Sequence, residues 1–271
     1  FQRLVKLKKK LFRDSIFLIL LGMATSLSLP PFNYFLINFF SFTFFFIFLF
    51  KKLNSQKLKK YFFLYGWLFG FGYFLTNLYW ISISLTFDKS FKFLIPIAII
   101  LIPAFLAIFY GLVSYLFMIF KTNQIIKSFL IFSLIFSILE FIRGSILTGF
   151  PWNLIAYSFV NQLEIISIIS IIGTYGFNLF CISLFSCPAL LILGKSNKET
   201  FVFIFFIICL SVSYLHGFQY KKKFNASNEI KQNYKIRAIG SSISLERFYS
   251  SNNPVSIIKE LIKISNPSLS E

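Results

Sequence analysis

Charge is scarce in this sequence, and acidic residues are the scarcest. Of 271 residues, 9 are Asp or Glu and 13% are charged, whereas soluble domains carry about 25%. The sequence has one histidine, His216, and three cysteines, Cys181, Cys187 and Cys209, which all lie within apolar runs. Because it contains no CxxC pair and no second histidine, it argues against a zinc site and a disulfide framework. We predict no metal and no cofactor.

Apolar side chains are abundant instead. Hydrophobic residues make up 57% of the chain, and 41 residues are Phe. This composition excludes a water-soluble globular protein, and it excludes intrinsic disorder, which requires low hydrophobicity. The formal net charge of +18 fits basic residues placed at a membrane surface, where anionic lipid headgroups are the expected partners. Nucleic acid is not an expected partner.

Long runs with little or no charge predict a membrane protein with seven helical spans. A helix needs about 20 apolar residues to cross a bilayer. Residues 15–50 carry no charge, and the sequence LPPFN at 29–33 divides them into two spans, because consecutive prolines cannot continue a helix. The remaining spans are expected at 61–87, at 93–120 with kinks at Pro96 and Pro103, and at 128–142, 165–193 and 200–218.

The distribution of basic residues predicts the orientation of these spans. Fifteen Lys and Arg residues lie at one set of span ends, before the first span and between the second and third, fourth and fifth, and sixth and seventh. Three lie at the other set. Because cytoplasmic loops carry the excess of Lys and Arg, we expect a cytoplasmic N-terminus. Seven crossings then place everything after residue 218 on the outer side.

The composition changes after residue 220, which predicts three regions. Residues 1–220 are expected to form the transmembrane helical bundle, 221–233 a polar linker, and 234–271 the start of an α/β domain. In that last region, 234–240 resembles a short strand and 254–264 has the apolar spacing of an amphipathic helix. The sequence begins with Phe and ends where a second strand would follow, so we expect a fragment or the product of an interrupted gene.

Glu140 in the fifth span and Arg143 just after it are candidate site residues. Glu140 and Arg143 are three positions apart, so their side chains can meet on one helix face. Ionisable residues inside a membrane are costly and mark functional or pairing sites. Two interpretations follow: a structural ion pair at the interface, or a polar pocket that receives a lipid headgroup.

Aromatic and amide residues at the predicted outer ends are further candidates. Trp152 and Asn153 lie in a loop with the turn-forming residues Gly149 and Pro151, although interfacial anchoring alone also explains a Trp there. Asn77 and Trp80 end the third span, after small residues at 70 and 72 that allow helices to approach closely. The glycines at 173 and 176 are expected to be helix-packing positions, since no strand precedes them as in a phosphate-binding loop.

Several blocks together resemble the apolipoprotein N-acyltransferase family. The blocks are GFGYF (70–74), YWI (79–81), EFIRG (140–144), LTGFPWNL (147–154) and IGTYGFN (172–178). The resemblance implies a transmembrane bundle in a bacterial inner membrane, followed by a nitrilase-like (carbon–nitrogen hydrolase) α/β domain outside it. It implies acyl transfer from a phospholipid, through a cysteine thioester, to the N-terminal diacylglyceryl-cysteine of an apolipoprotein.

The family's catalytic Glu, Lys and Cys are expected beyond the strand and helix of 234–271, so we assign no catalytic residue here. The predicted substrate-binding residues are Glu140, Arg143, Trp152, Asn153, Asn77 and Trp80. Two alternatives from other classes remain open. One is a multispan transporter or channel, and the other is a non-catalytic scaffold that binds lipid or lipoprotein.

Overall fold

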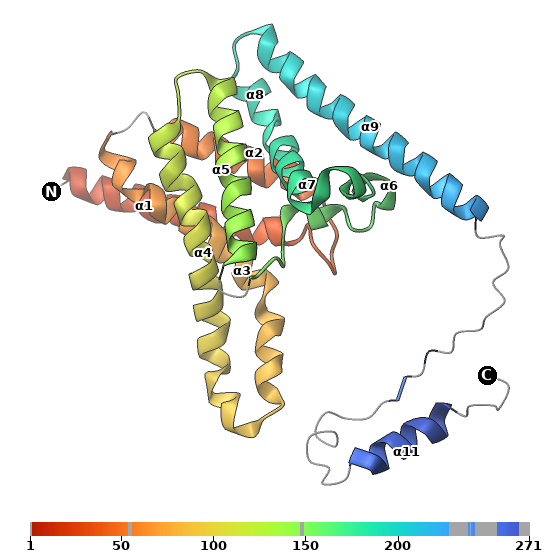
Figure 1. Ribbon diagram of the computed structural model, residues 1–271. Helices are drawn as coiled ribbons and strands as arrows, with labels where there is room; N and C mark the ends of the chain where they lie inside the picture. The colour runs from red at the N-terminus through yellow and green to blue at the C-terminus, as the bar shows by residue number, and fades with distance from the viewer. Residues whose placement is uncertain are drawn as a thin grey trace.

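The computed structural model describes residues 2–53, 56–146, 149–227, 238, 240, 241 and 254–265. Every regular element among them is helical (Figure 1). The elements are α1 (Gln2–Ser26), α2 (Leu36–Lys52), η1 (Gln56–Tyr61), α3 (Phe62–Asn77), η2 (Tyr79–Thr86), η3 (Lys89–Leu94), α4 (Ile95–Phe120), α5 (Ile125–Ser145), η4 (Ile155–Phe159), α6 (Leu163–Ile166), α7 (Ile169–Ser186), α8 (Pro188–Leu193), α9 (Asn197–Ser227) and α11 (Pro254–Ser265).

Within the described residues, four helices are long and apolar enough to cross a membrane. They are Lys89–Phe120, Ile125–Ser145, Ile169–Leu193 and Asn197–Ala226. A fifth span is possible if Leu58–Asn77 and Tyr79–Thr86, which are bent by 48° at their junction, cross together. The expected count of seven is therefore not confirmed. Two of the three spans not found are the first pair, because α1 carries charges through its first half and α2 has 17 residues. The third is the span expected at 61–87, which is the bent pair.

Other predictions about the spans can be compared directly. The expected hairpin is confirmed, since α1 ends at Ser26 and α2 begins at Leu36. Pro96 lies in the first turn of α4, where proline is compatible with a helix, so the kink expected there is wrong. Pro103 lies inside α4.

Glycines allow α1, α3 and α4 to pack with their backbones close together. A Cβ atom on Gly22 would lie 2.0 Å from the carbonyl oxygen of Phe69, and one on Gly72 would lie 2.2 Å from that of Ile19. Gly66 approaches α4 in the same way. The close approach expected around 70 and 72 is confirmed. It explains why α3 is rich in glycine despite the low helix propensity of that residue.

The glycines of α7 do not play the packing role expected of them. Gly173 has a φ of +72°, within a kink of α7, and nothing lies within 4 Å of the position its Cβ would take. A Cβ on Gly176 would meet only Ile172 of the same helix, at 3.5 Å. The expectation of helix packing was therefore wrong, and Gly173 instead supplies a backbone conformation that L-residues rarely adopt.

Phenylalanine fills the centre of the bundle. Phe45 of α2 stacks on Phe69 of α3 with ring centroids 4.1 Å apart, and Phe132 of α5 lies edge-on to Phe45 at 6.0 Å. All three side chains are fully buried. Offset and edge-to-face pairs of this kind are favoured by the ring quadrupole. The aromatic core fixes the relative positions of α2, α3 and α5, which carry or support the candidate site.

The basic ends of several helices lie together. Lys52, in the last turn of α2, pairs with Asp14 of α1. The Lys121 ammonium, just after α4, lies 5.4 Å from the centroid of the Phe50 ring of α2. A cavity joins the end of α2 to the start of α5 and to the connection between α8 and α9. The opposite helix ends surround the turn between α1 and α2.

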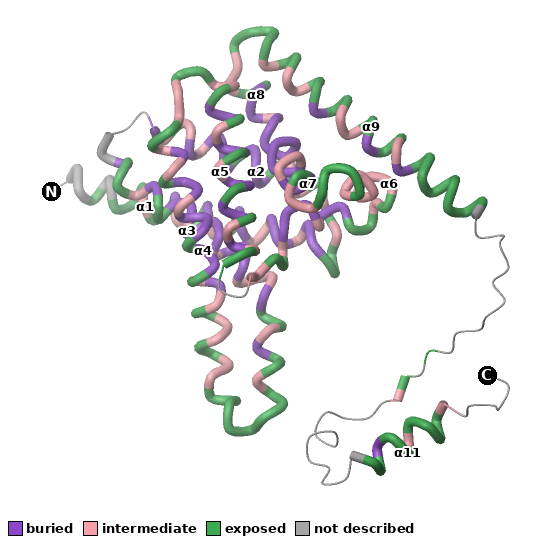
Figure 2. Tube along the Cα trace, in the orientation of Figure 1, coloured by how far each residue is buried: buried purple, intermediate pink, exposed green. Residues whose placement is uncertain are grey.

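Helix α9 lies at the side of the bundle and is largely exposed (Figures 1 and 2). It approaches α6 at Gly217, where a Cβ would lie 1.9 Å from the carbonyl oxygen of Glu164. One turn later Lys221 pairs with the Glu164 carboxylate at 2.6 Å. The helix continues to Ser227, so residues 221–227 of the expected linker are helical.

The second predicted region can be followed only in part. The expected strand at 234–240 falls almost wholly outside the described residues, and the described residues 238 and 240 have no regular structure. The amphipathic helix expected at 254–264 is confirmed by α11. Ile257 is buried, whereas Val255, Ile258 and Ile262 are exposed.

Candidate functional site

A cleft of about 530 Å³ opens at the end of the bundle where α1 and α3 finish. One wall is the turn between α1 and α2, and another is the junction of α3 with η2. The third is the loop before η4. Four of the six predicted substrate-binding residues line this cleft: Asn77, Trp80, Trp152 and Asn153. Prolines 30 and 31 of the hairpin turn form the opposite side.

The cleft combines aromatic surface with amide groups. The rings of Trp80 and Trp152 lie 5.8 Å apart at an interplanar angle of 51°, and both side chains remain about half exposed. The Asn77 amide nitrogen is shielded from solvent and has no hydrogen-bond partner among the described residues. A buried amide donor without a partner is costly. An acceptor bound in the cleft would therefore relieve that cost.

The loop that carries Trp152 is held in place by backbone contacts. The Tyr73 hydroxyl of α3 donates a hydrogen bond of 2.8 Å to the carbonyl oxygen of Asn153. Asn153 itself has a φ of +60°, a conformation that Asn tolerates better than most residues. Gly149 also has a positive φ, of +79°. Tyr73 and these two loop residues together set the direction in which Trp152 points.

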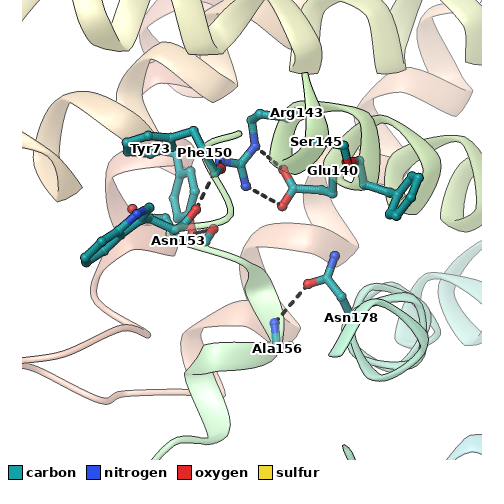
Figure 3. Close-up of polar contacts among 10 residues, drawn as sticks. Tyr73, Glu140, Arg143, Ser145, Phe150, Asn153, Ala156 and Asn178 are labelled. Carbon is teal, nitrogen blue, oxygen red and sulfur yellow. Dashed lines mark hydrogen bonds and ion pairs between the residues drawn. The ribbon is translucent and has the colours of Figure 1, made fainter. Parts of the chain in front are cut away.

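Arg143 is almost completely buried. Its guanidinium lies between Glu140 and the loop at Phe150 (Figure 3). Its guanidinium donates to both carboxylate oxygens of Glu140, at 3.2 and 2.8 Å. Its remaining terminal nitrogen donates to the carbonyl oxygens of Phe150 and Trp152, at 2.8 and 3.0 Å. The guanidinium also lies 5.3 Å from the centroid of the Phe74 ring. One buried arginine therefore ties α5 to the loop.

The predicted residues thus fall into two layers. Asn77, Trp80, Trp152 and Asn153 line the cleft, while Glu140 and Arg143 form a buried ion pair behind it. All the hydrogen bonds of the Arg143 guanidinium described above are made inside the protein, so it acts as a positioning residue for the loop.

Sequence reasoning did not single out two other contributors. Tyr73 lies within the GFGYF block and entered the sequence-based predictions only through the family resemblance. Asn178 of α7 accepts a hydrogen bond of 3.0 Å from the Ala156 backbone N–H and so holds the start of η4 (Figure 3). Its place at the end of the IGTYGFN block was the available signal, since that block is otherwise apolar or small.

The reactive side chains found in the described residues lie away from the cleft. Cys181 and Cys187 are buried in and after α7, and the cleft lining contains no cysteine, histidine or carboxylate. Within the described part of the chain, no three His, Cys, Asp or Glu residues are grouped as metal ligands would be. The cleft therefore offers binding surface and hydrogen-bond donors.

The comparison with known proteins concerns the same region. Residues 21–187 match the sequence model of a protein family, the apolipoprotein N-acyltransferase N-terminal domain. These residues include the whole cleft and the ion pair. The chain belongs to the apolipoprotein N-acyltransferase family. The family's relatives include the apolipoprotein N-acyltransferase of Rhizobium rhizogenes, which is 36% identical over 187 residues, or 66% of this chain and 35% of that protein.

Two further apolipoprotein N-acyltransferases show the extent of the match. The protein of Rickettsia prowazekii is 32% identical over 208 residues, which are 76% of this chain and 40% of the relative. That of Rhodopseudomonas palustris is 38% identical over 135 residues, which are 49% of this chain and 25% of the relative. The matched segments therefore span 40% or less of these apolipoprotein N-acyltransferases.

Proposed function

We propose that this chain forms the membrane-embedded, substrate-binding part of an apolipoprotein N-acyltransferase. In this proposal the cleft between the α1–α2 turn, η2 and the Trp152 loop receives an acyl-bearing substrate. That substrate is the phospholipid acyl donor or the diacylglyceryl-cysteine acceptor of an apolipoprotein. The observation that carries the proposal is the pairing of Trp80 with Trp152 beside the unpartnered amide of Asn77.

The chemistry of the cleft suits such a substrate. Lipids at a membrane surface present hydrocarbon next to ester carbonyl groups and a polar head. Trp rings match this boundary because they have an apolar body and one N–H donor. The Asn77 amide nitrogen can donate to an ester carbonyl oxygen at the same depth. Glu140 and Arg143 contribute by holding the loop and not by direct contact with the lipid.

The proposal includes the orientation of the bundle in a bacterial inner membrane. It takes α1 and α2 as short spans, so that seven crossings leave the N-terminus in the cytoplasm and the residues after α9 outside. The grouping of the basic helix ends around Lys52 and Lys121, away from the cleft, supports it. The cleft then faces the outer side, where the nitrilase-like domain implied by the family resemblance is expected.

We expect the 271-residue chain to bind such substrates without transferring an acyl group. Covalent acyl transfer needs an accessible thiolate next to a base. The three cysteines lie in or at the ends of helices α7 and α9, and Cys181 and Cys187 are fully buried. Turnover of a diacylated lipopeptide by the purified chain would contradict this expectation.

Photo-crosslinking tests the binding proposal. A diacylated lipopeptide with a photoreactive acyl chain is irradiated with the chain in nanodiscs, and the labelled peptides are mapped by mass spectrometry. We expect labels within 76–80 and 151–153, reduced at least fivefold by Trp80→Ala combined with Trp152→Ala. Phe201→Ala is the matched control, since Phe201 is an exposed aromatic residue at the start of α9.

Two outcomes would refute the proposal. One is labelling spread evenly over the lipid-exposed helices, with no preference for the cleft. The other is a cleft label that the tryptophan variant leaves unchanged. A deacylated form of the same peptide serves as competitor, and we expect it to reduce the label far less than the unlabelled diacylated form.

A further inference from the structure

A second cavity lies at the basic end of the bundle, at the opposite ends of the helices from the cleft. Its volume is about 550 Å³. It is formed by the last turn of α2, the first turn of α5 and the connection between α8 and α9, which lie close together (Figure 1). Neither the family resemblance nor the proposed function gives this cavity a role.

One side of the cavity is basic. Lys195 and Lys198 line it, both side chains are exposed, and neither forms an ion pair within the described part of the chain. Lys121 lies next to it, with its ammonium above the ring of Phe50, a lining residue. These three positive charges come from the α4–α5 connection, the α8–α9 connection and the first turn of α9.

The one carboxylate in the lining is already engaged. A Glu199 oxygen accepts hydrogen bonds from the Ser196 backbone N–H and hydroxyl, at 3.0 and 2.8 Å. This is the capping arrangement of a helix start, here that of α9. The Glu199 carboxylate is thereby directed toward Ser196. The lysines keep an excess of positive charge around the cavity.

The other side of the cavity is apolar and ends at a helix start. Phe50, Ile125 and Leu193 provide hydrocarbon surface from α2, α5 and α8. The residue before α5, Gln124, makes no side-chain hydrogen bond to the first turn. The N-terminal end of a 21-residue helix therefore meets the cavity without a side-chain cap, and its dipole favours a negative group there.

We propose that this cavity binds an anionic phospholipid of the surrounding leaflet. The phosphate lies between Lys195, Lys198 and the start of α5, and an acyl chain follows the apolar wall along Phe50 and Leu193. A free phosphate would use the basic side alone and leave the apolar wall unused. A zwitterionic lipid would bring no net charge to match the lysines. Both features of the cavity therefore favour a lipid with a net negative head.

Competitive photo-labelling in nanodiscs tests this site. The full chain is reconstituted in phosphatidylcholine with a trace of photoreactive phosphatidylglycerol, and the labelled peptides are mapped. We expect labelling within 121–126 and 193–199, and a matched photoreactive phosphatidylcholine should label these peptides several-fold less. A lysine near anionic lipid contributes about 1 kcal/mol to its binding, which is about fivefold in affinity. In Lys195→Gln combined with Lys198→Gln, the label should therefore fall by about fivefold for each lysine removed.

The control removes the same charge from the same end of the bundle. Lys59→Gln combined with Lys60→Gln changes two exposed lysines of η1 that do not line the cavity. We expect this pair to retain the label. Both double variants should give the circular dichroism spectrum and the gel-filtration volume of the parent chain.

Three results would overturn the proposal. The first is equal loss of label in the two double variants, which would indicate a diffuse positive field. The second is equal labelling by the anionic and zwitterionic probes. The third is complete protection by inorganic phosphate at the concentration of the lipid probe, which would show an anion site without lipid selectivity.

Discussion

The buried pair of Glu140 and Arg143 offers the sharpest test of how the cleft is built. Replacing Glu140 by Leu leaves the Arg143 guanidinium buried without a counter-charge, and arginine cannot release its proton in a protein. Breaking a buried ion pair from one side costs ~3–5 kcal/mol. The pair is almost inaccessible to solvent and joined by two hydrogen bonds. We therefore expect Glu140→Leu to lower the free energy of unfolding by an amount in that range.

Replacing Arg143 by Leu should have a different effect. A carboxyl group left alone in an apolar site can take up a proton, which limits the cost of its burial. The loop, however, loses the two bonds to the carbonyl oxygens of Phe150 and Trp152, at about 1.5–3 kcal/mol each because the donor is charged. Arg143→Leu should therefore destabilise by a similar amount to Glu140→Leu and disturb the position of Trp152 more.

The double variant completes the cycle. Apolar replacement of both partners of a buried ion pair is often close to neutral, so Glu140→Leu with Arg143→Leu should cost much less than the sum of the two single variants. Unfolding in mixed micelles of dodecyl maltoside and sodium dodecyl sulfate gives the free energies, and tryptophan fluorescence reports the loop. Lys59→Leu, which removes one exposed charge of η1, is the control and should leave the unfolding midpoint unchanged. A double variant as unstable as the sum of the two single variants would refute this account.

Two further predictions concern the helix contacts. Gly22→Leu places side-chain atoms where the carbonyl oxygen of Phe69 lies and should abolish recovery of monodisperse protein in gel filtration, whereas Gly176→Ala, with no atom nearer than 3.5 Å, should be tolerated. The hydrogen bond from Lys221 lowers the pKa of Glu164, so its support of the α6–α9 contact is present above the unfolded value of about 4.3 and is lost as pH falls through the lower folded value. Spin labels on α6 and α9 should move apart in that acidic range, and Lys221→Met should remove the pH dependence. A separation at neutral pH, or a pH-dependent separation that Lys221→Met leaves unchanged, would contradict this prediction.

Much of the bundle could be predicted because its signals are local. Charge-free runs and the prolines at 30 and 31 mark helices and turns without knowledge of their neighbours. The close-packing glycines at 70 and 72 were identified on the same basis. The span count was less accessible, because α1 mixes charged and apolar residues within one helix and α2 is short.

The arrangement of the six predicted residues in two layers could not be predicted from the sequence. Trp80 and Trp152 are 72 positions apart, and nothing local indicates that their rings lie 5.8 Å from each other. The i, i+3 spacing did indicate that Glu140 and Arg143 pair. It could not show that Arg143 would also hold two loop carbonyl groups, because that contact depends on the fold of residues 149–153. The role of Gly173 could not be predicted because a glycine in an apolar run fits both a close helix contact and a positive φ.

The central claim is that the Trp80–Trp152 cleft faces the outer side of the membrane. Single cysteines test it most directly, placed by Lys89→Cys at the start of η3, Lys59→Cys at the basic end and Lys259→Cys in α11, each in a chain whose three natural cysteines are replaced by serine. A membrane-impermeant maleimide should label Lys89→Cys and Lys259→Cys in intact spheroplasts, and Lys59→Cys only after permeabilisation. Labelling of Lys59→Cys in intact spheroplasts, with protection of Lys89→Cys, would contradict the account.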